Sequence, residues 1–140
     1  MTERTGSHDI DTDDAFIAVL IAAMDASGHA SPAEAERAHH IIWSMRRFHD
    51  REGGEVERRI DRMRTLIAEH GLAAIQQAAA REIPERLRPS AFAVAADLVL
   101  VDGRMERLES TFLRSLAADL RLDTPTADRI LEVIRIKNSS

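Results

Sequence analysis

The stretch "AFIAVLIAAM", residues 15–24, contains no polar side chain at all. A helix that is apolar on every side has no face to turn toward water, so it has to be buried by other elements. A second run of this kind, "AFAVAADLVLV" at residues 91–101, is interrupted only by Asp97. These two runs predict a pair of central helices with the rest of the chain packed around them.

The rest of the chain also predicts helices. Alanine, leucine, glutamate and arginine dominate, and no long segment alternates apolar and polar residues as a strand would. At 140 residues the chain has the length of one domain. We therefore expect a disordered tail at residues 1–11 and one all-α domain of about seven helices at 12–138. Glycine and proline residues, which begin or end helices, predict helices at about 13–26, 32–49, 54–69, 72–82, 86–101, 106–120 and 124–137.

An internal repeat relates the two apolar runs and the segments that follow them. When residues 16–45 are shifted by 75 positions onto 91–120, Gly28 falls on Gly103 and Glu34 falls on Glu109. An apolar helix then coincides with an apolar helix, and an amphipathic one with an amphipathic one. The pattern predicts two pseudo-repeated helix hairpins packed back to back, although the identity is low enough for chance to explain it.

Composition excludes several classes of function. The chain has no cysteine, which rules out disulfides, thiolate metal sites and cysteine nucleophiles. A net charge of −5 and few aromatic side chains argue against nucleic acid as a partner. The apolar runs are too short to span a bilayer, and the polar N-terminus is unlike a signal peptide. We expect a cytoplasmic protein.

Three carboxylates gather where the second apolar helix ends. Asp102 lies at the helix C-terminus, and Glu106 and Glu109 follow on the next turn. A carboxylate at the negative end of a helix dipole is disfavoured and needs a compensating positive group. A hard cation with oxygen ligands, Ca²⁺ or Mg²⁺, would reconcile all three carboxylates at this acidic corner.

A structural interpretation of the same corner stays open. Arg104 and Arg107 could neutralise the acids without a metal, and the carboxylates could cap the next helix. The first hairpin offers a weaker corner of the same kind, formed by Asp25, Ser27 and Glu34. Fewer carboxylates there predict weaker binding of a hard cation.

Asp97 interrupts a helix that the sequence predicts to be buried on every side. A buried carboxylate has to be paired or hydrogen-bonded. Arg81, Arg86 and Arg88 are the candidate partners along the chain. One interpretation is a structural ion pair. The other is that Asp97 helps to position the ligands of the acidic corner without binding the cation itself.

No catalytic constellation stands out. Glu36 and His39 have the spacing of di-iron helical bundles, but those need the pair twice together with two further glutamates. The histidines His39, His40 and His49 are expected on an exposed helix face, and the arginine-rich segment 46–64 on a salt-bridged solvent face. We therefore expect a protein that binds rather than catalyses.

The segment "AFAVAADLVLVDGRMERLESTFLRSLAADLRLD" (residues 91–123), followed by "ADRILEVIRIKN" (127–138), resembles the TerB-like tellurite-resistance family. The first hairpin, "AVLIAAMDASGHASPAEAE" (18–36), is similar to the other acidic repeat of that family. The resemblance implies an all-helical domain with a divalent-cation site at the acidic corners, usually for Ca²⁺. Asp102 and Glu109 match the family motif, whereas Ser27 stands where an aspartate is expected.

The resemblance also implies a function. It predicts a non-catalytic stress-response domain, related to tellurite resistance, with protein partners among membrane-bound Ter components. The leading hypothesis is a weak divalent-cation-binding interaction module, and a homodimer stays open. The alternatives are a structural adaptor without a metal site and, less favoured by its ligand count, a di-iron-type metalloenzyme.

Overall fold

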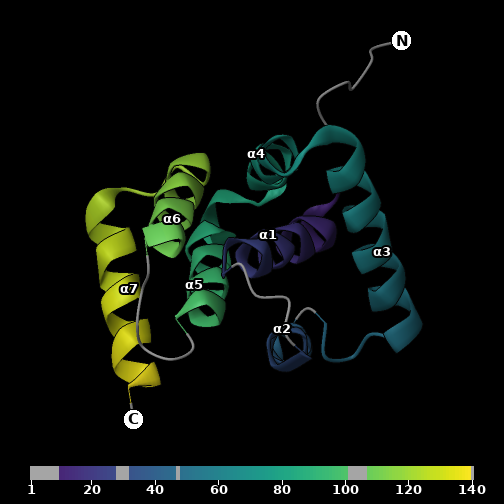
Figure 1. The fold of residues 1–140 in the computed structure, drawn as a ribbon, viewed down its shortest axis with the longest axis horizontal. Coiled ribbons are helices and arrows are strands. Elements are labelled where there is room, and N and C mark those ends of the chain that lie inside the picture. Colours follow the sequence, from purple (N-terminus) through teal and green to yellow (C-terminus); the bar gives the residue numbers. More distant parts are fainter. Residues whose placement is uncertain (1–9, 28–31, 47, 101–106, 140) are drawn as a thin grey trace.

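Helix α1 (Thr12–Ser27) runs through the middle of the structure (Figure 1). The computed structural model describes residues 10–27, 32–46, 48–100 and 107–139. Within these residues the chain forms an all-α single domain of seven helices and no strand. The other elements are α2 (Pro32–Ser44), α3 (Gly53–His70), α4 (Leu72–Glu82), a short 3-10 turn η1 (Glu85–Leu87), α5 (Arg88–Val99), α6 (Arg107–Asp119) and α7 (Thr124–Asn138).

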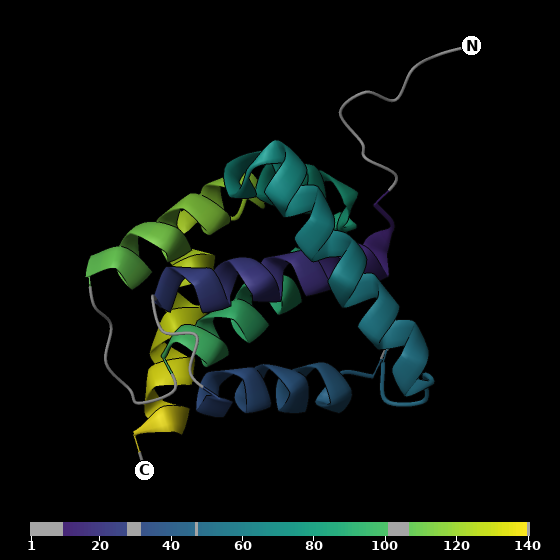
Figure 2. The ribbon, with the colours of Figure 1, turned by 45° about the vertical axis from the view of Figure 1, so that its right-hand side comes forward.

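The predicted central pair is confirmed. Helix α1 packs against α2, α3, α4, α5 and α6, and α5 packs against α1, α2, α6 and α7. Figure 2 shows α1 lying alongside α2, with α3 crossing it. Within residues 16–24 only Ile21 and Met24 are partly exposed. Full burial of a large apolar side chain contributes about 1.5–3 kcal/mol, so these helices supply much of the core.

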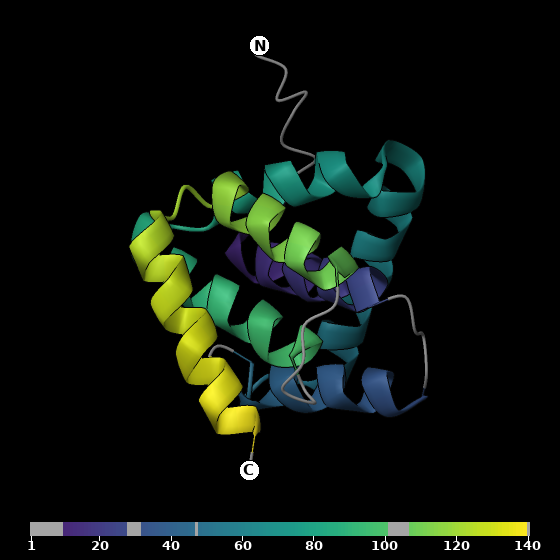
Figure 3. The same cartoon turned by 60° about the vertical axis from the view of Figure 1, so that its left-hand side comes forward.

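Helix α5 is less enclosed than the sequence predicts. Residues 91–100 are buried except for Ala93, Val94 and Asp97, which share one side of the helix and are half-buried. Asp97 on this side contacts Arg37 of α2 and Lys137 of α7, and α7 lies on the outside of the domain (Figure 3). Helix α7 itself leaves Val133 and Ile136 exposed, at 61% and 66% of their surface.

Two helix boundaries differ from the sequence prediction. Helix α2 ends at Ser44 rather than near residue 49, because the chain turns there to insert Phe48, which is fully buried. The turn is held by the Ser44 hydroxyl, which donates to the Ile41 carbonyl over 2.8 Å. Helix α5 begins at Arg88 instead of near residue 86, after the 3-10 turn η1.

The first described residues belong to the fold, although the sequence placed them in the tail. Ile10 is buried in the core, and Asp11 caps α1. The Asp14 N–H donates to Asp11 Oδ1 over 2.8 Å, and the Asp11 N–H donates to Asp14 Oδ2 over 3.3 Å. This reciprocal pair is a capping box. The rest of the predicted tail, residues 1–9, lies outside the described residues.

A single glycine allows α3 to be followed directly by α4. Gly71 has φ +93°, a conformation that costs glycine little, and its N–H donates to the Ile67 carbonyl over 2.8 Å. Helix α4 therefore starts at the next residue and returns across α1. No helix in the described ranges is both long and apolar enough to pass through a bilayer.

We expect Leu20→Ala, in the middle of α1, to lower the free energy of unfolding by about 2–5 kcal/mol. The substitution removes a fully buried side chain and leaves a cavity between several helices. Val133→Ala is the control, because Val133 is exposed and its truncation leaves no internal cavity. Urea unfolding followed by circular dichroism measures both, and equal losses would contradict the central position of α1.

Candidate functional site

The structure describes only part of the predicted acidic corners. Asp102 and Glu106 lie outside the described residues, as do the side chains of Ser27 and Glu34. Glu109 lies in the first turn of α6 and is half-buried, and Asp25 is exposed near the end of α1. The two cation sites therefore stay predictions.

The described residues contain no group of three or more histidine, aspartate or glutamate side chains that could hold a metal ion. The histidines that the sequence singled out on α2 and just after it are exposed. His39 Nε2 lies 4.0 Å from a Glu57 oxygen, and His49 Nε2 lies 3.2 Å from Asp50 Oδ1. Each is a contact with one carboxylate.

Asp97 is the meeting point of three helices. Its Oδ1 accepts hydrogen bonds from Arg37 Nη2 of α2 at 3.1 Å, Lys137 Nζ of α7 at 3.3 Å and Asn138 Nδ2 of α7 at 3.0 Å. Asn138 Nδ2 also donates to the Leu100 carbonyl at 3.0 Å. We call Asp97, Arg37, Lys137 and Asn138 the Asp97 junction.

The expectation of a partner for Asp97 is confirmed, but the predicted partners are wrong. Arg81, Arg86 and Arg88 make no ion pair with Asp97, and Arg88 Nε donates instead to the Ile83 carbonyl over 2.9 Å. Asp97 faces α2 and α7, while those arginines lie at or before the start of α5. The side chain of Asp97 is 19% exposed, so the junction is only partly screened by water.

A second ionic cluster fastens the beginning of α1 to α3. Arg59 Nη1 and Arg62 Nη1 donate to the two oxygens of Asp14, each over 2.8 Å. Arg51 Nη2 donates to Asp13 Oδ2 over 2.6 Å. The side chain of Asp14 is only 5% exposed, so this carboxylate depends on both arginines. With Asp11 and Glu55, which contact the same arginines, these residues form the α1–α3 ion cluster.

Opposing effects set the pKa values within this cluster. Burial acts to raise the pKa of Asp11, but the Asp14 N–H and Arg59 outweigh it and hold the pKa below its ordinary value. Burial likewise opposes the lowering of the Glu55 pKa, and Arg51 and Arg59 outweigh it. Burial acts to lower the pKa of Arg59, whereas its bonds to Asp11 and Asp14 raise it far above the ordinary range.

Sequence reasoning missed this cluster. The sequence analysis placed segment 46–64 on a salt-bridged solvent face and named no partner for Asp13 or Asp14. In the structure, three arginines of that segment turn inward to the acids. The available signal is the Arg59–Arg62 spacing, which puts both guanidinium groups on one side of a helix.

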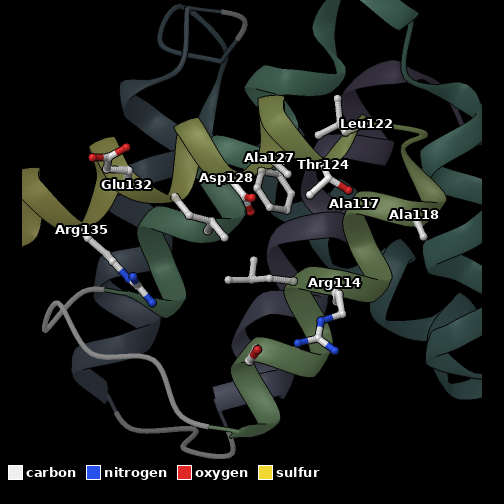
Figure 4. Close-up of a pocket in the computed structure, with 13 residues that line it drawn as sticks. Arg114, Ala117, Ala118, Leu122, Thr124, Ala127, Asp128, Glu132 and Arg135 are labelled. Atoms are coloured by element: carbon white, nitrogen blue, oxygen red, sulfur yellow. The ribbon is translucent and has the colours of Figure 1, made fainter.

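A cavity of about 680 Å³ lies between α6 and α7, over the start of α5 (Figure 4). Its walls mix apolar, hydroxyl and charged side chains. They are Phe92, Ser110, Leu113, Arg114, Ala117, Ala118, Leu122, Thr124, Ala127, Asp128, Leu131, Glu132 and Arg135. No residue of this cavity was predicted as a site, because its two walls become neighbours only when α6 and α7 fold onto α5.

Comparison with protein-family models finds no match for this chain, and comparisons with curated proteins and with solved structures find none either.

We expect Arg59→Gln to lower the free energy of unfolding by about 2–3 kcal/mol at neutral pH, because it leaves the buried Asp14 with one arginine. It should also flatten the dependence on pH. The low pKa values of Asp11 and Glu55 contribute stability that is present above the unfolded pKa, about 4, and is lost as the pH falls through the folded pKa. Without Arg59 this loss is smaller.

Urea unfolding at several pH values between 7 and 3 measures both effects. Arg58→Gln is the matched control, since Arg58 is an exposed neighbour on α3 that makes no ion pair with a described residue. An Arg59→Gln variant with the stability and pH slope of Arg58→Gln would show that the cluster contributes nothing.

We expect Asp97→Asn to lower the free energy of unfolding by about 1–2 kcal/mol, because asparagine keeps one acceptor oxygen but removes the negative charge that pairs with Arg37 and Lys137. Asp25→Asn, at an exposed position of α1, is the control. Thermal unfolding at neutral pH measures both, and an Asp97→Asn protein as stable as wild type would argue against an important charged pairing at the junction.

Proposed function

We propose that the chain is a TerB-like module that binds partners rather than catalysing a reaction. The observation that carries this proposal is the reciprocal packing of two helix pairs. Helix α1 contacts both α2 and α6, helix α5 contacts both α6 and α2, and the two central helices contact each other. Two pseudo-repeated hairpins packed back to back would have this pattern of contacts, which is what the resemblance implies.

The proposed activity is weak binding of Ca²⁺ or Mg²⁺ at the corner of Asp102, Glu106 and Glu109. Support comes from the two ends of that corner. The Asp97 junction ties down Leu100 just before it, through the hydrogen bond from Asn138. Helix α6 carries Glu109 in its first turn and buries Leu113 and Leu116 in the core. Fixed ends reduce the conformational entropy lost when a cation orders its ligands, and site rigidity favours affinity.

In this proposal Asp97 has a supporting role. It positions the end of α5 and binds no ion itself. The first corner, with Asp25, Ser27 and Glu34, would bind more weakly because it has fewer carboxylates. The cation would tune the association of a cytoplasmic stress-response module with a protein partner, for which the resemblance points to membrane-bound Ter components.

We expect millimolar Ca²⁺ to raise the melting temperature of the wild-type protein, with a dissociation constant of roughly 10⁻⁵–10⁻³ M. At free Ca²⁺ one hundred times that constant, linkage adds about 2.7 kcal/mol to the free energy of unfolding. Asp102→Asn should abolish most of this response. Differential scanning calorimetry with and without Ca²⁺ or Mg²⁺ measures it.

Asp123→Asn is the matched control, because Asp123 caps another helix by accepting from the Thr126 N–H over 3.2 Å. An asparagine caps almost as well, so this variant loses the same charge but keeps the response to Ca²⁺. If neither cation changes the melting temperature of the wild type, the corner is a helix cap and the structural adaptor is the better description.

A further inference from the structure

We propose that the cavity between α6 and α7 binds a small amphiphilic carboxylate, with an apolar body inside and its anionic group between Arg114 and Arg135. This inference does not depend on the cation proposal, since Asp25 and Glu109, the residues of the acidic corners whose side chains the structure describes, do not line the cavity. It would give the module a ligand site of its own.

The interior of the cavity suits an apolar body. Phe92 of α5 and Leu113 of α6 form a buried floor, and Leu131 of α7 lies across from them. At about 680 Å³ the space falls within the roughly 300–1,000 Å³ of small-molecule sites.

The cationic groups stand on opposite walls. Arg114 projects from α6, and Arg135 leans from α7 toward α6 (Figure 4). Neither guanidinium forms an ion pair with a described residue, in contrast to Arg51, Arg59 and Arg62 of the α1–α3 ion cluster. Two arginines that are available on facing walls can both donate to one carboxylate.

Two acidic side chains also line the cavity, and their positions restrict the ligand. Figure 4 shows Glu132 directed away from α6, while Asp128 lies nearer to Ala127 and Thr124. Along α7, Asp128 precedes Arg135 by seven residues, or about 10 Å of helix rise. The anionic group of the ligand is therefore expected beside Arg135 and not beside Asp128. In the reverse orientation the ligand would bring its negative charge close to the Asp128 carboxylate, which would repel it.

The test uses sodium decanoate as probe and the full chain, labelled with ¹⁵N and ¹³C. Decanoate should shift the NMR signals of Phe92, Leu113 and Leu131 in a saturable way, in the absence of divalent cations. Decyltrimethylammonium, which has the same chain length and the opposite charge, should bind at least tenfold more weakly. If decyltrimethylammonium binds as tightly as decanoate, the proposal is wrong.

Variants of the protein test separately whether decanoate binding depends on the arginine charges and on the space in the cavity. Arg114→Gln and Arg135→Gln should each weaken decanoate binding by about three- to tenfold, because each removes one charged hydrogen bond from an exposed arginine. Arg129→Gln, on α7 but outside the cavity, should not change it. Ala118→Trp places a large side chain at an exposed position on the α6 wall of the cavity, and it should weaken decanoate binding.

A further control addresses unspecific binding of amphiphiles. Val133→Gln removes one of the two large exposed apolar side chains of α7, outside the cavity, and should leave decanoate binding unchanged. Loss of binding in Val133→Gln, or binding by Arg114→Gln and Arg135→Gln equal to wild type, would show that decanoate does not occupy the proposed site.

Discussion

The burial of α1 on all sides is the constraint on which the rest of the structure depends. A helix with no polar face can be accommodated only if neighbours surround it, and five helices do so here. Because α1 comes first in the chain, each later helix up to α6 packs against an element that precedes it. The fold is therefore organised by one apolar segment, and α7 alone is placed by α5 instead.

The burial of α1 also buries two carboxylates, those of Asp13 and Asp14, at the beginning of the helix. A buried carboxylate without partners would cost several kcal/mol. The α1–α3 ion cluster removes this cost, since arginines of α3 and the segment before it meet both acids. The cluster also sets the position of α3 along α1, because charged hydrogen bonds require a defined geometry that apolar contacts do not.

The Asp97 junction acts in a similar way at the other end of the domain. It holds the C-terminal residues of α7 against α5 and α2. Elsewhere along α7, the cavity separates this helix from α6. One consequence is a fixed end of α5 next to the predicted acidic corner. The other is an open cavity, since α7 is held at its C-terminus by polar contacts and at Ala127 and Ile134 by packing.

The sequence by itself determined the all-α class, the existence of seven helices and the central pair, because apolar periodicity and helix punctuation are local properties. It also required a partner for Asp97. Only the tertiary structure decided which partner, since Arg37 and Lys137 lie 60 and 40 positions away along the chain. The same holds for the pairing of Asp14 with Arg59 and for the cavity between α6 and α7. Long side chains such as arginine can reach many places, and the packing of the helices selects one of them.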